Sequence, residues 1–382
     1  MRCCNDPSTS LPGTARDPSL HVNYTRGMIL GVDDYVQEFA YLAGRSQRVV
    51  REFVGYGTSS GLAVRLEATA EGPEIHVRPG TAAMPSGKLV CVPIEQCGLI
   101  NRWLARSDTD AAIRRLLASD DSPPDSPPDS PLDPSTSPGP FTVSAYLTLC
   151  YAECPTLPVP IPGEPCRSED SLMQPSRIAD DYLLSLRLEP PPQTEEDAVR
   201  DFADWLALVP IDEGAVSTPA NERRWIEALT AAAQPWFDAV YGNPPASPPP
   251  ASPPPASPPP TAATLGDYMF GTPPEDLSIR PEDYPAFLRV AFRFWVTALR
   301  PMWSRMLCGV PAVEADDCLL LARLVVPIVW SGGSPTGAWQ VVDDGDAEIR
   351  IDESRRPFLV HLRLAQEWQI LTSRSPIRTE ES

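Results

Sequence analysis

Residues 141–151 read Phe-Thr-Val-Ser-Ala-Tyr-Leu-Thr-Leu-Cys-Tyr, and this stretch decides the fold expected for the second half of the chain. Apolar or aromatic side chains occupy every second position, which is the period of a β-strand with one buried face. The alternation at 182–188 and the apolar run at 318–330 predict two further strands. We expect strands within 141–190 and 317–365 to pair into one sheet, with the helices between them forming an insertion.

The first half of the chain predicts a smaller module. Residues 32–54 predict a helix that ends at Gly55, because apolar side chains recur there at helical spacing. Its apolar stripe consists of Tyr35, Phe39, Leu42, Val49 and Phe53. The period then changes to two, which predicts a small antiparallel sheet. Its strands are expected at 62–67, 75–77 and 88–92. Residues 94–117 predict a second helix, broken near Ser107.

Helical patterns fill the region between the predicted strands of the second half. Helices are expected to start near Thr194, which has Asp197 three residues later as a weak capping box, at Asn221 and at Tyr284. Their expected core side chains are Phe202, Leu206, Val209, Trp225, Leu229, Leu288, Phe292, Trp295 and Leu299. The stripe with Phe292 and Trp295 also fits an exposed partner surface, although core packing is the commoner role. Residues 358–371 fit a strand or a helix, with Leu362, Trp368 and Leu371 as core candidates.

Two proline tracts divide the chain. The 382 residues include 48 prolines, against about 19 in an average chain of this length. Residues 120–140 and 244–260 hold the repeats, and such segments bury too little apolar surface to order themselves. We therefore expect an α+β protein with a disordered arm at 1–24 and a module at 25–119. The first linker and a mixed block at 141–382 follow, and the second linker, a stiff polyproline spacer, interrupts that block.

Charge and hydropathy exclude some classes of protein. The net charge of −20 disfavours nucleic acid as a partner, because an acidic surface repels phosphates. No run of residues approaches the roughly 18–20 apolar residues of a membrane span, and the start of the chain lacks the apolar segment of a secretory signal. The nine cysteines suit a chain of ordinary size, so we expect mostly reduced thiols and a cytoplasmic location.

The stretch Gly57-Thr58-Ser59-Ser60-Gly61 matches the Gly-x-Ser-x-Gly pattern of a hydrolase nucleophile elbow. That elbow follows a strand and precedes a helix, whereas here the predicted order is helix first and strand after. A serine nucleophile also needs a base. The chain has three histidines, and His21 and His76 lie in poor contexts for that role, unlike His361. We expect a glycine-rich turn at this stretch and assign no catalytic residue.

Cys150, Cys154 and Cys166 invite a zinc interpretation. Structural zinc takes four ligands, and no fourth ligand lies nearby in the sequence. A disulfide between Cys154 and Cys166, closing a proline-rich loop at 155–165, is an alternative under oxidising conditions, and ordinary thiols are the favoured interpretation. The acidic stretch 343–346 lacks the ligand spacing of a calcium loop. We therefore expect no metal, cofactor-binding or catalytic site.

Three groups of residues carry a resemblance to a known family. The first comprises Gly27 to Asp34, Gly55 to Gly57, Ser60 to Val64 and Val77 to Ala82. The second comprises Cys150 to Pro155 and Pro160 to Asp170, and the third Arg356 to His361 and Gln366 to Trp368. These runs resemble an uncharacterised bacterial family found with phage-tail-like contractile injection systems.

The resemblance implies a non-enzymatic structural or accessory component of such a particle, related to its baseplate or fibres. Its partners would be other protein subunits of the assembly, and no cofactor is implied. Two alternatives stay open at this point. One is a free-standing protein-binding module that uses the loop at 155–170, and the other is an enzyme of unrecognised type.

Overall fold

A computed structural model describes residues 19–120, 141–160, 173–215, 221–235, 237, 270–303, 317–331, 337–342 and 348–373. The chain forms two compact units. One contains Phe39–Pro191 and Glu314–Ser382 and holds the strands, and the other contains Asp17–Glu38 and Pro192–Val313 and holds a group of helices. The antiparallel sheets and the helices confirm the expected α+β class.

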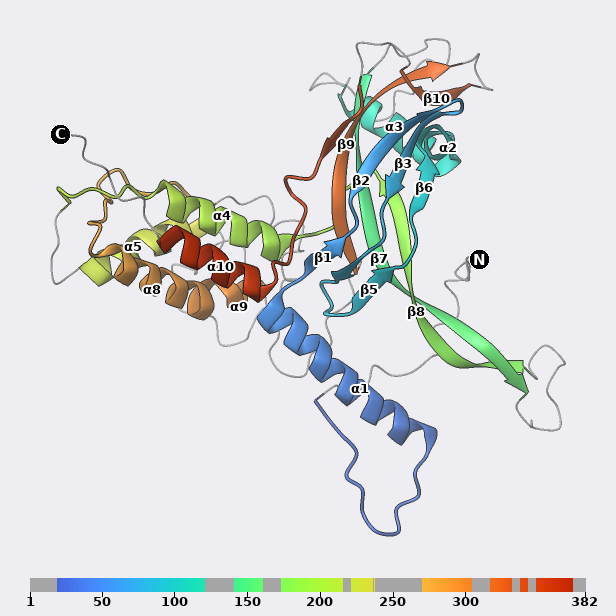
Figure 1. The fold of residues 1–382 in the computed structure, drawn as a ribbon, viewed down its shortest axis with the longest axis horizontal. Coiled ribbons are helices and arrows are strands. Elements are labelled where there is room, and N and C mark those ends of the chain that lie inside the picture. Colours follow the sequence, from blue (N-terminus) through green and yellow to red (C-terminus); the bar gives the residue numbers. More distant parts are fainter. Residues whose placement is uncertain are drawn as a thin grey trace, which may run out of the picture. The chain divides into compact units, whose positions relative to one another are not determined.

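Helix α1 (Val32–Val49) is labelled in Figure 1 and continues as the π-helix η1 (Val50–Val54). Together they confirm the helix predicted over residues 32–54. Asp33 and Asp34 lie in the first turn of α1, where their negative charge interacts favourably with the positive end of the helix dipole. The helix ends at Gly55, which has a φ of 86° and donates its backbone N–H to the carbonyl of Val50. Helix α1 contains no buried residue, so its apolar stripe faces solvent.

The predicted small sheet is present as two three-stranded antiparallel sheets. The first has the order β1-β4-β5 and consists of Gly57–Gly61, Gly80–Ala83 and Leu89–Val92. The second has the order β2-β3-β6 and consists of Val64–Thr69, Gly72–Val77 and Gln96–Leu99. Strand β1 replaces the turn expected at Gly57–Gly61. Strand β6 replaces the first turn of the helix expected at 94–117, because Gln96–Leu99 pairs with β3.

Helices α2 (Ile100–Leu104) and α3 (Ser107–Asp120) confirm the expected break near Ser107. Ile100 and Leu104 of α2 and Ile113 of α3 are fully buried. Two polar contacts join these helices to a later strand, β10 (Ala338–Val341). Trp339 Nε1 donates to Asp110 Oδ1 at 2.9 Å, and Asn101 Oδ1 accepts from the backbone N–H of Val341 at 2.9 Å.

The strands of the second half form one five-stranded antiparallel sheet, as predicted, with the order β10-β9-β7-β8 and with β11 also paired to β9. Besides β10, the sheet consists of β7 (Phe141–Pro160), β8 (Met173–Arg187), β9 (Cys318–Ser331) and β11 (Arg350–Asp352). Val143, Ala145, Leu147 and Leu149 are buried, so the alternation predicted from residues 141–151 is confirmed. The proline loop expected from Pro155 is wrong as far as Pro160, because these residues pair with β8.

One hydrophobic core joins the N-terminal sheets, α2 and α3 to the five-stranded sheet. It contains, for example, Leu62 and Val77 from the first half and Leu149 and Leu324 from the second. The module expected at 25–119 and the strands expected beyond 141 therefore share a core. The expected linker at 120–140 lies outside the described residues, apart from Asp120.

The inserted helices build a second core of their own. They are α4 (Thr194–Leu208), α5 (Asn221–Ala232), α8 (Tyr284–Phe294), η3 (Trp295–Leu299) and α9 (Arg300–Trp303). Phe202, Trp205, Trp225 and Phe287 meet in this core through aromatic contacts, such as the edge-to-face pair of Trp225 and Phe287 at 5.6 Å. The predicted core positions Phe202, Leu206, Val209, Trp225, Leu229 and Leu299 are buried, Leu288 and Trp295 are half-buried, and Phe292 is exposed.

Two smaller expectations about the helices need correction. Thr194 is the first residue of α4, and its predecessor Gln193 occupies the cap position without a side-chain cap bond. At 358–371 the chain forms helix α10 (Leu362–Ser373), and Leu362 is exposed and thus lies outside the core. The burial of Trp368 and Leu371 and the second linker, 244–260, lie outside the described residues.

Candidate functional site at the base of a two-stranded arm

Strands β7 and β8 extend beyond the sheet as a two-stranded ribbon (Figure 1). Strand β7 pairs with β9 from Phe141 to Cys150, and with β8 from Tyr146 to Pro160. The residues after Cys150 are therefore paired on one side by β8 and are beyond the end of β9. We call the paired segments 151–160 and 173–182 the arm, and most of its side chains are exposed.

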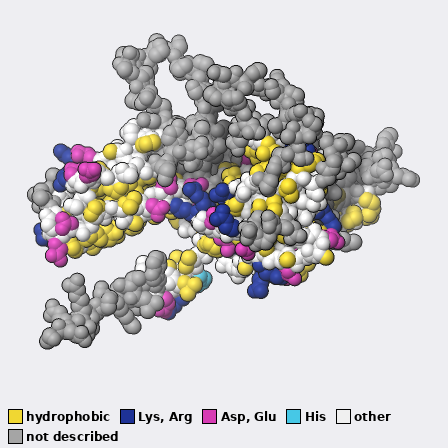
Figure 2. Space-filling view, turned by 90° about the horizontal axis from the view of Figure 1, so that it is seen from above, with side chains coloured by type: hydrophobic (Ala, Val, Ile, Leu, Met, Phe, Trp, Pro, Cys, Tyr) yellow, Lys and Arg dark blue, Asp and Glu magenta, His cyan; other side chains and the backbone are white. Residues whose placement is uncertain are grey.

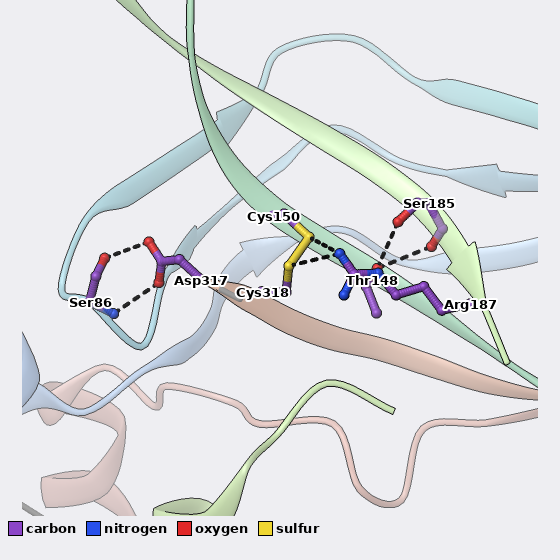
Figure 3. The surroundings of a disulfide bond; sticks show 7 residues. All are labelled: Ser86, Thr148, Cys150, Ser185, Arg187, Asp317 and Cys318. Carbon is purple, nitrogen blue, oxygen red and sulfur yellow. Dashed lines mark hydrogen bonds between the residues drawn. A yellow bond between two sulfur atoms is a disulfide. The ribbon is translucent and has the colours of Figure 1, made fainter. Parts of the chain in front are cut away.

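A disulfide joins β7 to β9 where the arm leaves the sheet (Figure 3). Cys150 and Cys318 are direct cross-strand partners, and both are buried. The bond links residues 168 positions apart in sequence. The expectation of a reduced Cys150 is therefore wrong, because pairing of the two strands places the sulfurs side by side. Cys154, Cys91 and Cys97 are thiols, and Cys166 lies outside the described residues.

The disulfide is covered by a cationic side chain from the neighbouring strand. Nη2 of Arg187 lies 3.3 Å from the sulfur of Cys150 and 3.3 Å from that of Cys318. Two residues before Cys150 on β7, the buried hydroxyl of Thr148 donates to the carbonyl of Ser185 at 3.2 Å and lies 3.0 Å from its hydroxyl. Figure 3 shows these groups around the sulfur–sulfur bond. A guanidinium next to two sulfurs favours a thiolate whenever the bond is reduced.

Asp317, which precedes the disulfide, ties the base of the arm to the turn between β4 and β5. Its two carboxylate oxygens accept from the backbone N–H of Ser86 at 3.0 Å and from the hydroxyl of Ser86 at 2.6 Å. The carbonyl of Asp317 accepts from the backbone N–H of Tyr151 at 3.1 Å. Asp317 thus joins the turn between β4 and β5 and the start of the arm to the residue next to the disulfide.

Tyr151 is the first residue of the arm and the centre of a polar network. Its hydroxyl donates to Asp180 Oδ1 at 2.7 Å and lies 3.1 Å from Glu153 Oε1. The ammonium of Lys88 lies 4.2 Å from the ring centroid and 3.6 Å from Glu153. Burial, the hydrogen bond to Asp180 and the charge of Glu153 raise the pKa of Tyr151 well above the ordinary tyrosine value. The network fixes the direction in which the arm leaves the sheet.

Beyond this base the arm exposes apolar side chains on both of its strands. They are Leu157, Val159, Met173 and Ile178. Four prolines, at 155, 158, 160 and 175, lie in the paired strands and remove backbone donors from them. The arm therefore offers apolar contacts and a stiff backbone to a partner, while its prolines limit uncontrolled pairing with other strands.

Ser59 lies on strand β1, where its hydroxyl is 2.9 Å from the hydroxyl of Thr81 and 3.1 Å from the carbonyl of that residue. The hydroxyl of Ser59 therefore contacts Thr81, whereas the serine nucleophile of a hydrolase would contact a general base. His76 lies on β3 among glutamates, 3.3 Å from Glu74 and 3.5 Å from Glu67. The structure brings neither residue into a nucleophile–base pair.

Strand β1 instead docks a segment close to the C-terminus. The backbone N–H of Thr58 donates to the carbonyl of Pro357, and its carbonyl accepts from Leu359, each at 2.9 Å. The buried guanidinium of Arg356 donates to the hydroxyl of Thr58 at 3.0 and 3.1 Å. A Cβ at Gly57 would lie 2.9 Å from the backbone of Pro357, so glycine permits this close approach. The Gly-x-Ser-x-Gly pattern therefore has a packing explanation.

The described residues contain no group of three or more His, Cys, Asp or Glu side chains that could hold a metal ion. The acidic stretch 343–346 lies outside this part of the chain. Among the helices that the structure describes, none is long and apolar enough to cross a membrane. Acidic and basic side chains are interspersed with hydrophobic ones on the face shown in Figure 2.

Sequence reasoning missed most residues of the site, among them Cys318, Arg187 and Asp317. One signal pointed to the first of them, because Cys150 and Cys318 lie at the ends of two strands that were expected to share a sheet. Comparison with known proteins adds no identification: no protein-family model matches the chain, and no curated protein matches it significantly.

Proposed function

We propose that the protein is a non-enzymatic structural or accessory component of a phage-tail-like contractile injection particle, related to its baseplate or fibres. In this proposal the arm binds another protein subunit of the assembly. The observation that carries the proposal is the combination of exposed apolar side chains, such as Leu157 and Ile178, with a base fixed by the Cys150–Cys318 disulfide.

A partner gains from this arrangement for a physical reason. Ordering a flexible segment on binding costs conformational entropy, and a segment that is already rigid avoids most of that cost. The base of the arm is held in one conformation by the disulfide, by Arg187 and by the hydrogen bonds of Tyr151.

The residues behind the family resemblance support the same use of the fold. Cys150 forms the disulfide with Cys318, Tyr151 to Pro155 start the first strand of the arm, and Pro160 ends that strand. Arg356 and Pro357 hold the C-terminal segment on β1. In the proposed scheme, residues of the second group take part in the contact and those of the third group support the scaffold.

The proposed location is the cytoplasm of the producing cell, followed by incorporation into the assembled particle. Disulfides are rare in the cytosol and persist under oxidising conditions. The contacts of Arg187 and Tyr151 hold the base of the arm during assembly. A particle that leaves the cell meets oxidising conditions, so we expect the Cys150–Cys318 bond to strengthen this base at that stage.

Co-sedimentation with sheathed particles tests the proposal. We expect the wild-type protein to appear in purified particles, and we expect the double substitution Leu157→Asp and Ile178→Asp to remove it from them. Leu208→Asp is the matched control, because Leu208 is equally exposed but belongs to α4 and not to the arm. Two observations together would contradict the proposal: the wild-type protein is found only in the soluble pool, and particles assemble normally in a strain that lacks its gene. Recovery of one stable non-particle partner through the arm would favour the free-standing binding module instead.

A further inference from the structure

Helix α1 carries an apolar seam with the spacing of a coiled coil. Apolar side chains occupy positions 32, 35, 39, 42 and 49, and Ser46 completes the alternating spacing of three and four residues. This pattern is the a and d register of a heptad, in which each seam residue faces a second helix. We call these six residues the seam: Val32, Tyr35, Phe39, Leu42, Ser46 and Val49.

All six seam residues are exposed, and the five apolar ones are between 55% and 79% exposed. Other sides of the same helix are partly covered. The segment before α1 runs along it, with the carbonyl of Leu20 accepting from Gln37 at 2.6 Å and the backbone N–H of Val22 donating to Glu38 at 3.0 Å. The helix thus uses polar side chains for contacts within the chain and leaves its apolar seam uncovered, which is the reverse of a helix packed on its own core.

The residues that flank the seam restrict the partner. On one flank, the e positions are Val36 and Ala43, which are apolar, and on the other, the g positions are Glu38 and Arg45, which carry opposite charges. In a parallel pair of such helices each g residue faces an e residue, so the two charges would lie against apolar side chains. In an antiparallel pair e faces e and g faces g. Val36 and Ala43 then meet apolar groups, and Glu38 meets Arg45.

We propose that α1 pairs with α1 of a second copy of this chain, in an antiparallel two-helix interface about the seam. A two-fold axis presents the same patch twice, so the attraction between Glu38 and Arg45 occurs at two symmetrical places. The helix spans 18 residues, or about 27 Å. An interface of this length gives a dimer that dissociates on dilution. This proposal is independent of the particle, because it concerns the free protein.

Sedimentation equilibrium of the full-length chain over a range of concentrations tests the pairing. We expect the mass to rise from 41.6 kDa towards twice that value as concentration increases. Leu42→Glu removes a central seam contact and adds a buried charge, so we expect at least a tenfold weaker association, equivalent to about 1.4 kcal/mol. Arg48→Glu is the control, since Arg48 lies on the same helix outside the seam and its flanks. We expect it to leave the association within about twofold of wild type.

A charge exchange tests both the orientation and the identity of the partner. Glu38→Arg places two arginines together in the antiparallel pair, and Arg45→Glu places two glutamates together, so each single variant should associate less than wild type. The double variant restores opposite charges and should recover most of the loss. Circular dichroism of each variant checks that α1 remains helical.

Three results would overturn the proposal. The first is a mass that stays at 41.6 kDa at every concentration. The second is a dimer that is insensitive to Leu42→Glu. The third is a double charge variant no better than the singles, which excludes the antiparallel copy as the partner. Binding of a different protein to α1 while the free chain stays monomeric falls under the first result.

Discussion

Gly61 shows at the level of one residue why the glycines around Ser59 are needed. Its φ is 63°, and a Cβ at this position would lie 2.1 Å from the carbonyl oxygen of Pro79. Strand β1 must turn there to bring Leu62, which is fully buried, into the core. The residue is therefore constrained both by its backbone conformation and by the space around it.

We expect Gly61→Ala to lower the free energy of unfolding by about 2–4 kcal/mol, because it combines left-handed backbone strain with a steric clash. Urea denaturation measures the change. Gly98→Ala is the matched control: Gly98 also lies in a strand, and a Cβ there meets no atom within 4 Å. A loss of the same size in both variants would mean that the contact with Pro79 is not the cause.

Tyr151 predicts a pH dependence of stability. The folded protein holds the phenolic proton more tightly than the unfolded chain does, because burial and the contacts with Asp180 and Glu153 raise the pKa of Tyr151. The contribution of the protonated phenol to stability is therefore complete below about pH 10, the pKa of tyrosine in the unfolded chain. The free energy of unfolding falls as the pH rises above that value.

Tyr151→Phe should therefore flatten the decline in unfolding free energy between about pH 9 and pH 11, while also costing the hydrogen bond to Asp180 at neutral pH. Urea denaturation at a series of pH values gives both quantities. Tyr146→Phe, on the same strand, is the control. An unchanged decline in the Tyr151 variant would remove the phenol as its source.

At the scale of elements, the disulfide decides how firmly the arm is held on the sheet. It restricts the unfolded chain over a separation of 168 residues, and a bond of this kind contributes about 2–5 kcal/mol. Replacing both Cys150 and Cys318 by alanine should lower the unfolding free energy by that amount and speed proteolysis within the arm. Cys91→Ala, an exposed thiol, should leave both measurements unchanged.

Reduction provides a second test of the same element. Treatment with a thiol reductant should bring the wild-type protein to the stability of the double alanine variant, and should leave that variant as it was. A wild-type protein that is indifferent to reductant would show that the bond does not contribute to the stability of the sheet.

On the scale of the whole molecule, two separate cores predict two unfolding transitions. Leu149 belongs to the core of the sheets and Leu229 to the core of the inserted helices, and both are fully buried. Each truncation to alanine should cost about 2–5 kcal/mol. In calorimetry Leu149→Ala should shift one transition and Leu229→Ala the other. A single transition that both variants shift equally would contradict independent cores.

Much of the architecture was predictable because periodicity is a local property. The alternation at 141–151, the apolar run at 318–330 and the helices at 32–54 and 284–299 are all confirmed. Strand β6 was not predicted, because residues 96–99 gain their partner only from β3. Strand β1 was missed for a similar reason: a glycine-rich stretch with little apolar character becomes a strand when β4 and the C-terminal segment pair with it.

Apolar spacing along short stretches is enough to predict the α+β class, the shared sheet of the second half and the insertion of helices between its strands. Three further features come only from tertiary packing. It placed Cys150 beside Cys318, set Arg187 over their sulfurs and left the stripe of α1 exposed. Each depends on strand register or on which faces remain uncovered after packing, and these are set by contacts between distant residues.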